Sequence, residues 1–271
     1  MTNAQAETCE SCGTILHETD RSDDGVAGKL CTRCRDLMFV REAFDARLID
    51  IMTLGLRVGD VSRALAILDE VNSAWMQRDH DGWLDKSVRS SRALILSRNG
   101  RHEEALGDLR VVEANTFFGG DDYVLNKISI ARTLEGAGRL SDALGELVPV
   151  IAVWENLPIG TIPGLLSVYA DIASGAEVAV DAHCCQILAA WEAKVGMSIH
   201  ENVSVNDFRE AARDANKEWN QAHRRFAAMC SAIRGGSREV REGSIAEYVA
   251  SEPVGYLRER ARSLLDEPEE E

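Results

Sequence analysis

Four cysteines near the N-terminus have the type and spacing of a metal site. Cys9 and Cys12 form one C-x-x-C pair, Cys31 and Cys34 form a second, and eighteen residues separate the pairs. Two such pairs can converge on one tetrahedral site with four thiolate ligands. A segment this short cannot bury a core, so metal binding would supply its folding free energy. The sequence therefore predicts a structural metal site at these four cysteines.

The segment 1–35 resembles a zinc ribbon, because Gly13 after the first pair suits the tight turn that points backbone amides at the sulfurs. The resemblance implies Zn²⁺ as a structural cofactor. Iron is disfavoured, since the second pair lacks the Pro and Gly of rubredoxin-type knuckles. A dithiol redox pair and a vestigial site remain as alternatives. His17 could replace one thiolate, but with four cysteines present a surface role is the better interpretation.

The predicted metal site is joined directly to a helix, because a long helical pattern begins at Asp36, two residues after the second cysteine pair. The helical part of the chain contains a sequence pattern that occurs three times. Each copy consists of a glycine, a polar spacer, Ala-Leu, two further residues and a Leu. The alanines Ala64, Ala105 and Ala143 are 41 and 38 residues apart. The pattern occurs without internal gaps at residues 58–68, 99–109 and 137–147. A period of this size, with helical patterns on both sides of a glycine, predicts an array of helical hairpins.

Each copy has a physical interpretation. Glycine tolerates the left-handed conformation that ends a helix, so Gly59, Gly100 and Gly138 should close the first helix of each hairpin. The second helix then presents an apolar stripe, since residues four and three apart share a face. The stripes are Ala64, Leu68 and Val71; Ala105, Leu109 and Val112; and Ala143, Leu147 and Val150. The first helices carry Ala93 with Leu96 and Ala131 with Leu134 in matching positions.

These small and large apolar positions resemble the tetratricopeptide repeat over roughly residues 36–155. The early Trp and the closing Pro of the family are missing, and the spacing exceeds the usual 34, so the repeats are degenerate. A fourth unit is predicted at 163–195, with Gly175 as the helix end and Val180, Cys184 and Ile187 as the stripe. An ordinary helical bundle that reuses one hairpin is the alternative.

The amino-acid composition favours a helical protein that does not span a membrane. The 271 residues are 45% hydrophobic and include only five prolines, and the apolar runs are far shorter than a membrane span. No basic and apolar N-terminal signal is present, so a cytoplasmic location without a membrane is expected. The net charge of −15 disfavours nucleic acid as a partner without excluding it, because a local basic face can still exist.

One late helix is the only basic region, predicted over residues 203–233 with an apolar stripe from Phe208 to Cys230. Arg209, Arg213 and Lys217 recur every four residues along it. They form either a solvated face balanced by neighbouring carboxylates or a docking surface for an acidic partner or nucleic acid. Two short helices at 244–250 and 254–265 and an acidic tail at 266–271 should follow.

Enzymatic motifs are missing from the sequence. It contains no nucleophile elbow, P-loop, dinucleotide fingerprint or metalloprotease histidine pair. His183, Cys184 and Cys185, with Cys230, could suggest a thiol or metal site, but Cys184 occupies the leucine position of the predicted fourth repeat. A buried cysteine behaves there as a small hydrophobic residue.

We therefore predict an all-α, tetratricopeptide-like solenoid with an N-terminal zinc ribbon. Its predicted segments are 1–35 (ribbon), 36–200 (repeats), 201–265 (helical cap) and 266–271 (tail). The expected function is a non-enzymatic cytoplasmic adaptor for a protein or peptide.

The family resemblance implies that the first helix of each hairpin lines the groove, which would present Arg57, Arg98 and Arg132 to a ligand. Arginine suits carboxylates because its planar fork binds both oxygens. A zinc-ribbon regulator that binds nucleic acid through the basic region 209–241 is the main alternative, and a redox enzyme built on the C-x-x-C pairs is a third.

Overall fold

The structure is a computed structural model that describes residues 30–79, 81–197, 203–234 and 237–265. Within these ranges the regular secondary structure is helical and contains no strand. The prediction of an all-α fold is therefore confirmed for the described residues. Cys9, Cys12, Gly13 and His17, together with the tail 266–271, lie outside them.

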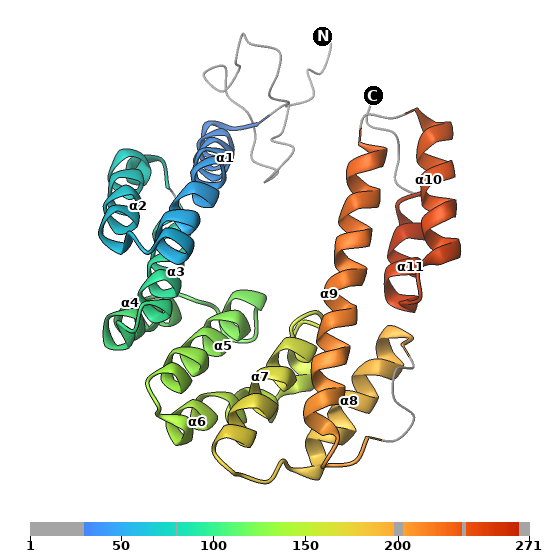
Figure 1. Cartoon of the computed structure of the whole chain (residues 1–271). Helices are drawn as coiled ribbons and strands as arrows, with labels where there is room; N and C mark the ends of the chain where they lie inside the picture. Colours follow the sequence, from blue (N-terminus) through green and yellow to red (C-terminus); the bar gives the residue numbers. More distant parts are fainter. Residues whose placement is uncertain (1–29, 80, 198–202, 235–236, 266–271) are drawn as a thin grey trace, which may run out of the picture. The chain divides into compact units, whose positions relative to one another are not determined.

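The chain divides into two compact units, residues 1–115 and 116–271 (Figure 1). The described helices of the first unit are α1 (Thr32–Met52), the π-helical turn η2 (Thr53–Val58), α2 (Val61–Trp75), η3 (Met76–Arg78), α3 (Trp83–Arg98) and α4 (His102–Ala114). Those of the second unit are α5 (Asp121–Gly136), α6 (Leu140–Ile151), η4 (Trp154–Asn156), α7 (Ile162–Gly175), α8 (Ala182–Val195), α9 (Phe208–Ile233), α10 (Arg238–Ser251) and α11 (Gly255–Ser263).

Three glycines end the first helices of the repeated hairpins, as predicted. Gly59, Gly100 and Gly138 have φ angles of 77°, 76° and 75°, in the left-handed region that glycine adopts without steric cost. After the last of them, the Arg139 N–H donates to the Leu134 carbonyl at 2.8 Å. This bond back across the helix end is typical of a Schellman closure, and it sends the chain into the second helix.

The first hairpin contains one feature that the repeated pattern alone does not predict. Its first helix ends in η2, where the Asp60 N–H donates to the Leu54 carbonyl at 3.0 Å, one residue further back than in the other hairpins. Gly55 in this turn packs on Ile95, and a Cβ at Gly55 would lie only 2.8 Å from that side chain. The Asn99 amide also donates to the Gly55 carbonyl at 3.1 Å. The wider turn therefore permits a close approach of backbone to α3.

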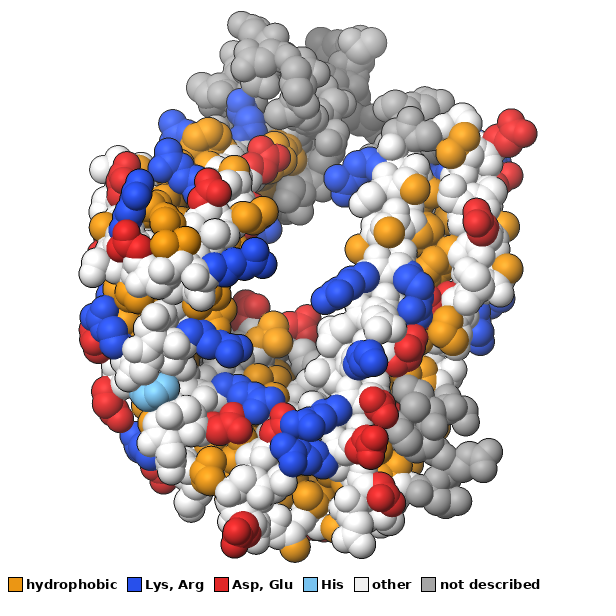
Figure 2. Space-filling view, in the orientation of Figure 1, with side chains coloured by type: hydrophobic (Ala, Val, Ile, Leu, Met, Phe, Trp, Pro, Cys, Tyr) orange, Lys and Arg blue, Asp and Glu red, His pale blue; other side chains and the backbone are white. Residues whose placement is uncertain are grey.

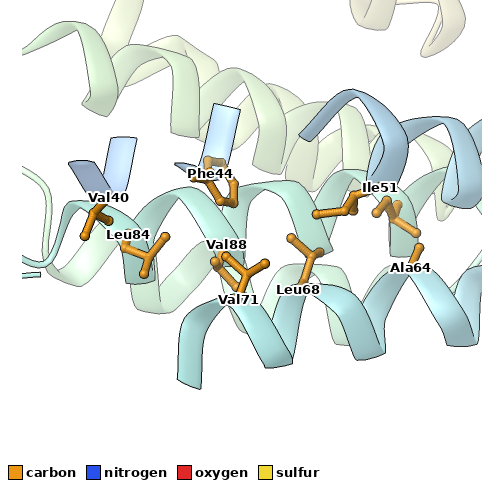
Figure 3. Close-up of a cluster of buried hydrophobic side chains, with 9 residues drawn as sticks. Val40, Phe44, Ile51, Ala64, Leu68, Val71, Leu84 and Val88 are labelled. Carbon is orange, nitrogen blue, oxygen red and sulfur yellow. The ribbon is translucent and has the colours of Figure 1, made fainter. Parts of the chain in front are cut away.

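The predicted apolar stripes are buried in all three hairpins. The nine stripe residues of α2, α4 and α6 are each at most 5% exposed, and the alanines are fully buried. In the first unit, Ala64, Leu68 and Val71 pack with residues of α1 and α3 (Figure 3). Ala93, Leu96, Ala131 and Leu134 in the first helices are buried as well. The register of the repeats is therefore confirmed, whereas the way in which successive hairpins stack into a solenoid stays a prediction.

This register makes a stability prediction on a single helix. Ala105 of α4 has no exposed surface, whereas Ala114 at the end of the same helix is exposed. Ala105→Leu is therefore expected to overpack the contact between α3 and α4 and to cost about 1–3 kcal/mol of unfolding free energy. Ala114→Leu is the matched control and should change stability by less than about 0.5 kcal/mol. Chemical denaturation measures both, and equal losses would contradict the register.

The two helices of the predicted fourth unit are present, but α7 packs mainly against α6 and α9 rather than against α8. α7 and α8 form where a hairpin was expected, and Cys184 and Ile187 are buried in α8. Gly175, however, is not the left-handed residue at the end of α7, because Glu177 has the positive φ of 54° instead. Val180 precedes α8 and does not belong to its buried stripe. The assignment of both residues was wrong because the connection here is longer than in the repeats.

The long polar helix of the C-terminal part is confirmed as α9, which begins at Phe208, five residues after the predicted start. α10 and α11 pack against it (Figure 1). The α9 residues Phe208, Ala212, Ala215 and Trp219 are buried, as the stripe predicted, whereas Phe226 and Cys230 at its end are only partly buried. Among the helices of the described residues, none combines the length and the hydropathy of a membrane span.

Candidate functional site

The second cysteine pair lies at the start of the first described helix. Cys31 is the N-cap residue of α1, which begins four residues before the predicted start at Asp36, and Cys34 lies in its first turn. Cys31 has an extended backbone (φ −67°, ψ 158°), so the pair spans the entry of the chain into the helix. Since Cys9 and Cys12 lie outside the described residues, the four-cysteine zinc site stays a prediction. The described residues alone hold no group of three or more His, Cys, Asp or Glu that could bind a metal.

The three predicted groove arginines have different surroundings. Arg57 and Arg98 are exposed residues of the first unit, and they form no ion pair with the described residues. Arg132 belongs to α5 of the second unit and is half-buried. A ligand-binding groove lined by all three arginines stays a prediction. The contacts of Arg132, in contrast, are defined within its own unit.

Arg132 meets two arginines of α9 at one carboxylate. Its Nη2 lies 2.8 Å from Oδ2 of Asp171 on α7, whereas Oδ1 of Asp171 lies 3.0 Å from Arg209 Nε and 2.6 Å from Arg213 Nη2. Three guanidinium groups thus share one carboxylate, whose side chain is only 12% exposed. We refer to Arg132, Arg209, Arg213 and Asp171 as the arginine cluster.

Two further contacts orient the arginine cluster. Arg132 Nη1 donates to Glu135 at 2.8 Å, and Arg209 Nη1 donates to the Ser174 hydroxyl at 3.0 Å. Three positive side chains therefore face two negative ones. Each guanidinium carries five N–H donors, and the contacts above use only part of them. Because the three arginine side chains are 40%, 46% and 51% exposed, the remaining donors can reach a ligand from solution.

Asp171 stays ionised in these surroundings. Burial alone would raise the pKa of its carboxyl group, but hydrogen bonds from Arg132 and Arg209 hold that pKa below its ordinary value. A charged Asp171 is needed here, because three guanidinium groups that converge without a counter-ion would repel one another. The carboxylate therefore acts as an internal anchor that fixes the arginines of two helices in one place.

The arginine cluster continues into a line of basic residues on α9. We call Arg209, Arg213, Lys217 and Arg224 the basic stripe, because spacings of four and seven residues keep them on one exposed face. Figure 2 shows Lys and Arg side chains along α9 on the face in view. The acidic residues Glu210, Asp214 and Glu218 follow the same spacing one position later and so form a separate, neighbouring line. Opposite charges on α9 are therefore segregated rather than alternating.

Sequence reasoning found the basic stripe but missed Asp171. A signal was present, since Asp171 is the one charged residue of α7, whose other residues are apolar, small or hydroxyl-bearing. A lone carboxylate on an otherwise apolar helix needs a partner from another element. Which partner it finds depends on the packing of α7 against α5 and α9, and helical periodicity carries no information on that.

The thiols of α8 are unsuited to nucleophilic chemistry. Burial raises the pKa of the Cys184 thiol to about 12 and also raises that of Cys185. The reactive form of a cysteine is the thiolate, and Cys184 would hold almost none of it near neutral pH. Burial of Cys184 in the apolar stripe supports the packing role predicted for it.

No protein-family model, curated protein or solved structure matches the chain. The residues and contacts of this chain are therefore the sole basis for inferring its function.

Proposed function

We propose that the protein is a non-enzymatic adaptor that binds an acidic segment of a partner protein through the arginine cluster and the basic stripe. One observation carries the proposal. Three guanidinium groups from α5 and α9 are held on Asp171 with about half of each side chain exposed. Charge-assisted hydrogen bonds from fixed guanidinium groups are the strongest polar contacts available to a carboxylate. The tetratricopeptide-like hairpins contribute through Arg132, which lies on a first helix, where that family binds its ligands.

The charge of the whole molecule supports a selective role for this surface. A net charge of −15 repels acidic partners in general, so an acidic segment gains favourable contacts only at a local basic surface. The basic stripe extends the arginine cluster along α9, which suits an extended segment with several negative groups. The neighbouring acidic line would disfavour a misplaced segment by like-charge repulsion.

Nucleic-acid binding through the region 209–241 is the second candidate, and its basic composition favours it. Part of that charge is used internally, however. Arg225 is paired with Glu218 and Glu252, and Arg238 is paired with Glu242. The basic surface that remains is flanked by carboxylates, which a polyphosphate backbone would also have to approach. These contacts favour a protein segment over a duplex.

Capture from native cell extract tests the adaptor proposal. The double variant Arg209→Gln/Arg213→Gln should capture about one tenth or less of the amount of specific partner that the native protein captures. The reason is that each charge-assisted bond contributes about 1.5–3 kcal/mol. Arg63→Gln/Arg262→Gln removes the same charge from two exposed positions outside the cluster and should retain the partner fully. Quantitative mass spectrometry measures the retained amounts.

Two further measurements separate the remaining alternatives: capture with variants of the first unit, and a titration with duplex DNA. Loss of the partner in Arg57→Ala/Arg98→Ala, but not in Arg209→Gln/Arg213→Gln, would assign binding to the first unit. Duplex DNA that binds with useful affinity and a steep salt dependence would favour the nucleic-acid regulator instead.

We also propose that Cys9, Cys12, Cys31 and Cys34 hold a structural Zn²⁺ in a cytoplasmic protein. The support is the spacing of both pairs and the position of Cys31 and Cys34 close together in the chain at the start of α1. Bound zinc would tie the N-terminal segment to this helix. The chain's own contribution is four thiolates, whose negative charge the metal offsets in part.

Zinc content gives the corresponding prediction. Protein purified without chelators should carry about one zinc ion per chain by elemental analysis. The variant Cys31→Ser/Cys34→Ser should lose it, whereas Cys185→Ser/Cys230→Ser, which changes two thiols of the second unit, should keep it. Zinc-free native protein or full zinc content in the first variant would contradict the site.

A further inference from the structure

We infer that the arginine cluster recognises a phosphate group on the partner, as in a phosphoserine or phosphothreonine peptide. This inference rests on the proposed adaptor function and specifies the chemistry of its ligand. It starts from the two oxygens of Asp171, which already engage three guanidinium groups from two helices. The donors are thus assembled before a ligand arrives.

The charge balance favours phosphate over carboxylate. Asp171 and Glu135, the two carboxylates paired with the three arginines, leave one arginine charge uncompensated, and Lys217 adds a second on the next turn of α9. In the described part of the chain, the acidic line of Glu210, Asp214 and Glu218 lies beside them on α9 but forms no ion pair with Arg209 or Arg213. A peptide carboxylate would bring a single negative charge, whereas a phosphorylated side chain carries about −1.5 to −2 at neutral pH. A phosphate also offers three acceptor oxygens, so it can accept hydrogen bonds from guanidinium groups that approach from α5 and α9 together.

Asp171 makes this site ready for binding. Long arginine side chains lose rotamer freedom when a ligand orders them, and that loss weakens affinity. Here the ordering has already occurred, because Arg209 is fixed by both Asp171 and Ser174 and Arg132 by both Asp171 and Glu135. The incoming phosphate would use the exposed N–H groups without displacing the carboxylate.

The face of α5 adds an apolar contact beside the arginine cluster. Leu125 is 53% exposed and lies seven residues before Arg132, which places both on one side of the helix. Seven residues of helix rise about 10 Å, and an extended peptide covers that length in about three residues. The peptide that fits therefore carries an apolar residue three positions from its phosphorylated residue.

A peptide titration tests this inference directly. The probe is a fluorescein-labelled peptide, Ala-Leu-Ala-Ala-phosphoserine-Ala-Ala-Leu, compared with the same peptide carrying serine or glutamate at the fifth position. Anisotropy should show the phosphopeptide binding at least about tenfold more tightly than the serine peptide and more tightly than the glutamate peptide. Arg213→Gln should weaken the phosphopeptide about tenfold while Arg262→Gln leaves it unchanged.

Inorganic phosphate provides a second readout that needs no peptide. Relative to chloride at the same ionic strength, it should raise the melting temperature of the native protein by more than it raises that of Arg209→Gln or Arg213→Gln, because the general stabilisation by excluded phosphate is common to all three proteins. Equal binding of all three peptides, no effect of Arg213→Gln, or tighter Arg213-dependent binding of an oligothymidylate would overturn the inference. The capture experiment could still succeed in those cases, so the adaptor proposal and the phosphate inference fail separately.

Discussion

Replacement of Arg225 by alanine is expected to lower the unfolding free energy of the second unit by about 3–5 kcal/mol, because it leaves a buried carboxylate without its partner. Arg225 on α9 donates to both oxygens of Glu252, at 2.8 Å from Nε and 3.0 Å from Nη2. The side chain of Glu252 has no exposed surface. The backbone N–H of Val254 also donates to it at 3.0 Å, so this carboxylate joins α9 to the turn between α10 and α11.

The loss should depend on pH in a defined direction. Burial by itself would raise the pKa of Glu252, but the hydrogen bonds of Arg225 and the Val254 amide lower it below its ordinary value. The native pair therefore stabilises the fold above the ordinary glutamate pKa of about 4.3, and this stability is lost as the pH falls through the lowered pKa. Arg225→Ala removes the largest influence that lowers the pKa of Glu252, so that pKa should rise and the difference from native protein should shrink on acidification.

Urea denaturation at pH 7 and at pH 4 measures both effects. Arg238→Ala is the control, because Arg238 and Glu242 of α10 form a pair with side chains 76% and 53% exposed, and such pairs contribute less than about 1 kcal/mol. The double variant Arg225→Leu/Glu252→Leu should recover much of the stability, since it removes the buried charge together with its partner. A loss of the same size for Arg225→Ala and Arg238→Ala would contradict the argument.

The repeated hairpins could be predicted from the sequence because their determinants are local. A glycine that must adopt a positive φ and an alanine followed by leucine at helical spacing specify a helix end and a buried stripe within about a dozen residues. Gly138 and Ala143 illustrate this, since the first is left-handed and the second is fully buried. Each such feature depends on residues that are neighbours along the chain.

Other features depend on residues far apart in the chain and could not be predicted in this way. The π-helical turn around Gly55 is stabilised by contacts to Ile95 and Asn99, some forty residues later. The pairing of Arg132 with Asp171 depends on which turn of α7 faces α5. At the end of α7, Glu177 adopts a conformation that favours glycine, so the residue type misled the prediction about Gly175. The zinc ligands rest on spacing alone, because two of them lie outside the described residues.

Asp171 and Glu252 show two uses of a charged pair on opposite sides of α9. Glu252 is buried and engaged by one arginine, so its pairing serves stability. Asp171 is also shielded, but it engages three arginines that remain about half exposed. Stability alone would require one partner for that carboxylate. The surplus of exposed donors is the physical reason for assigning binding to Asp171 and its arginines, and a structural role to Glu252.

Trp191→Ala should destabilise the second unit by about 3–5 kcal/mol, the usual cost of removing a large aromatic side chain from a core. Trp191 of α8 is fully buried, and its indole N–H donates to the Ile159 carbonyl at 2.8 Å. Its ring meets that of Trp219 on α9 edge-on, with centroids 5.5 Å apart. The variant would therefore leave a cavity, an unpaired carbonyl and a loosened contact beneath α9.

Two controls separate packing from polar effects. Phe117→Ala removes an aromatic ring that is 91% exposed in the same unit and should change stability by less than about 0.5 kcal/mol. Trp191→Phe keeps most of the volume but loses the indole donor, so about 1–3 kcal/mol of the loss should remain. Because α9 carries Arg209 and Arg213, Trp191→Ala should also weaken phosphopeptide binding at temperatures below its melting transition. Unchanged binding in a destabilised Trp191→Ala protein would show that the arginine cluster is held in place by Asp171 and its immediate partners, independently of the aromatic contact between α8 and α9.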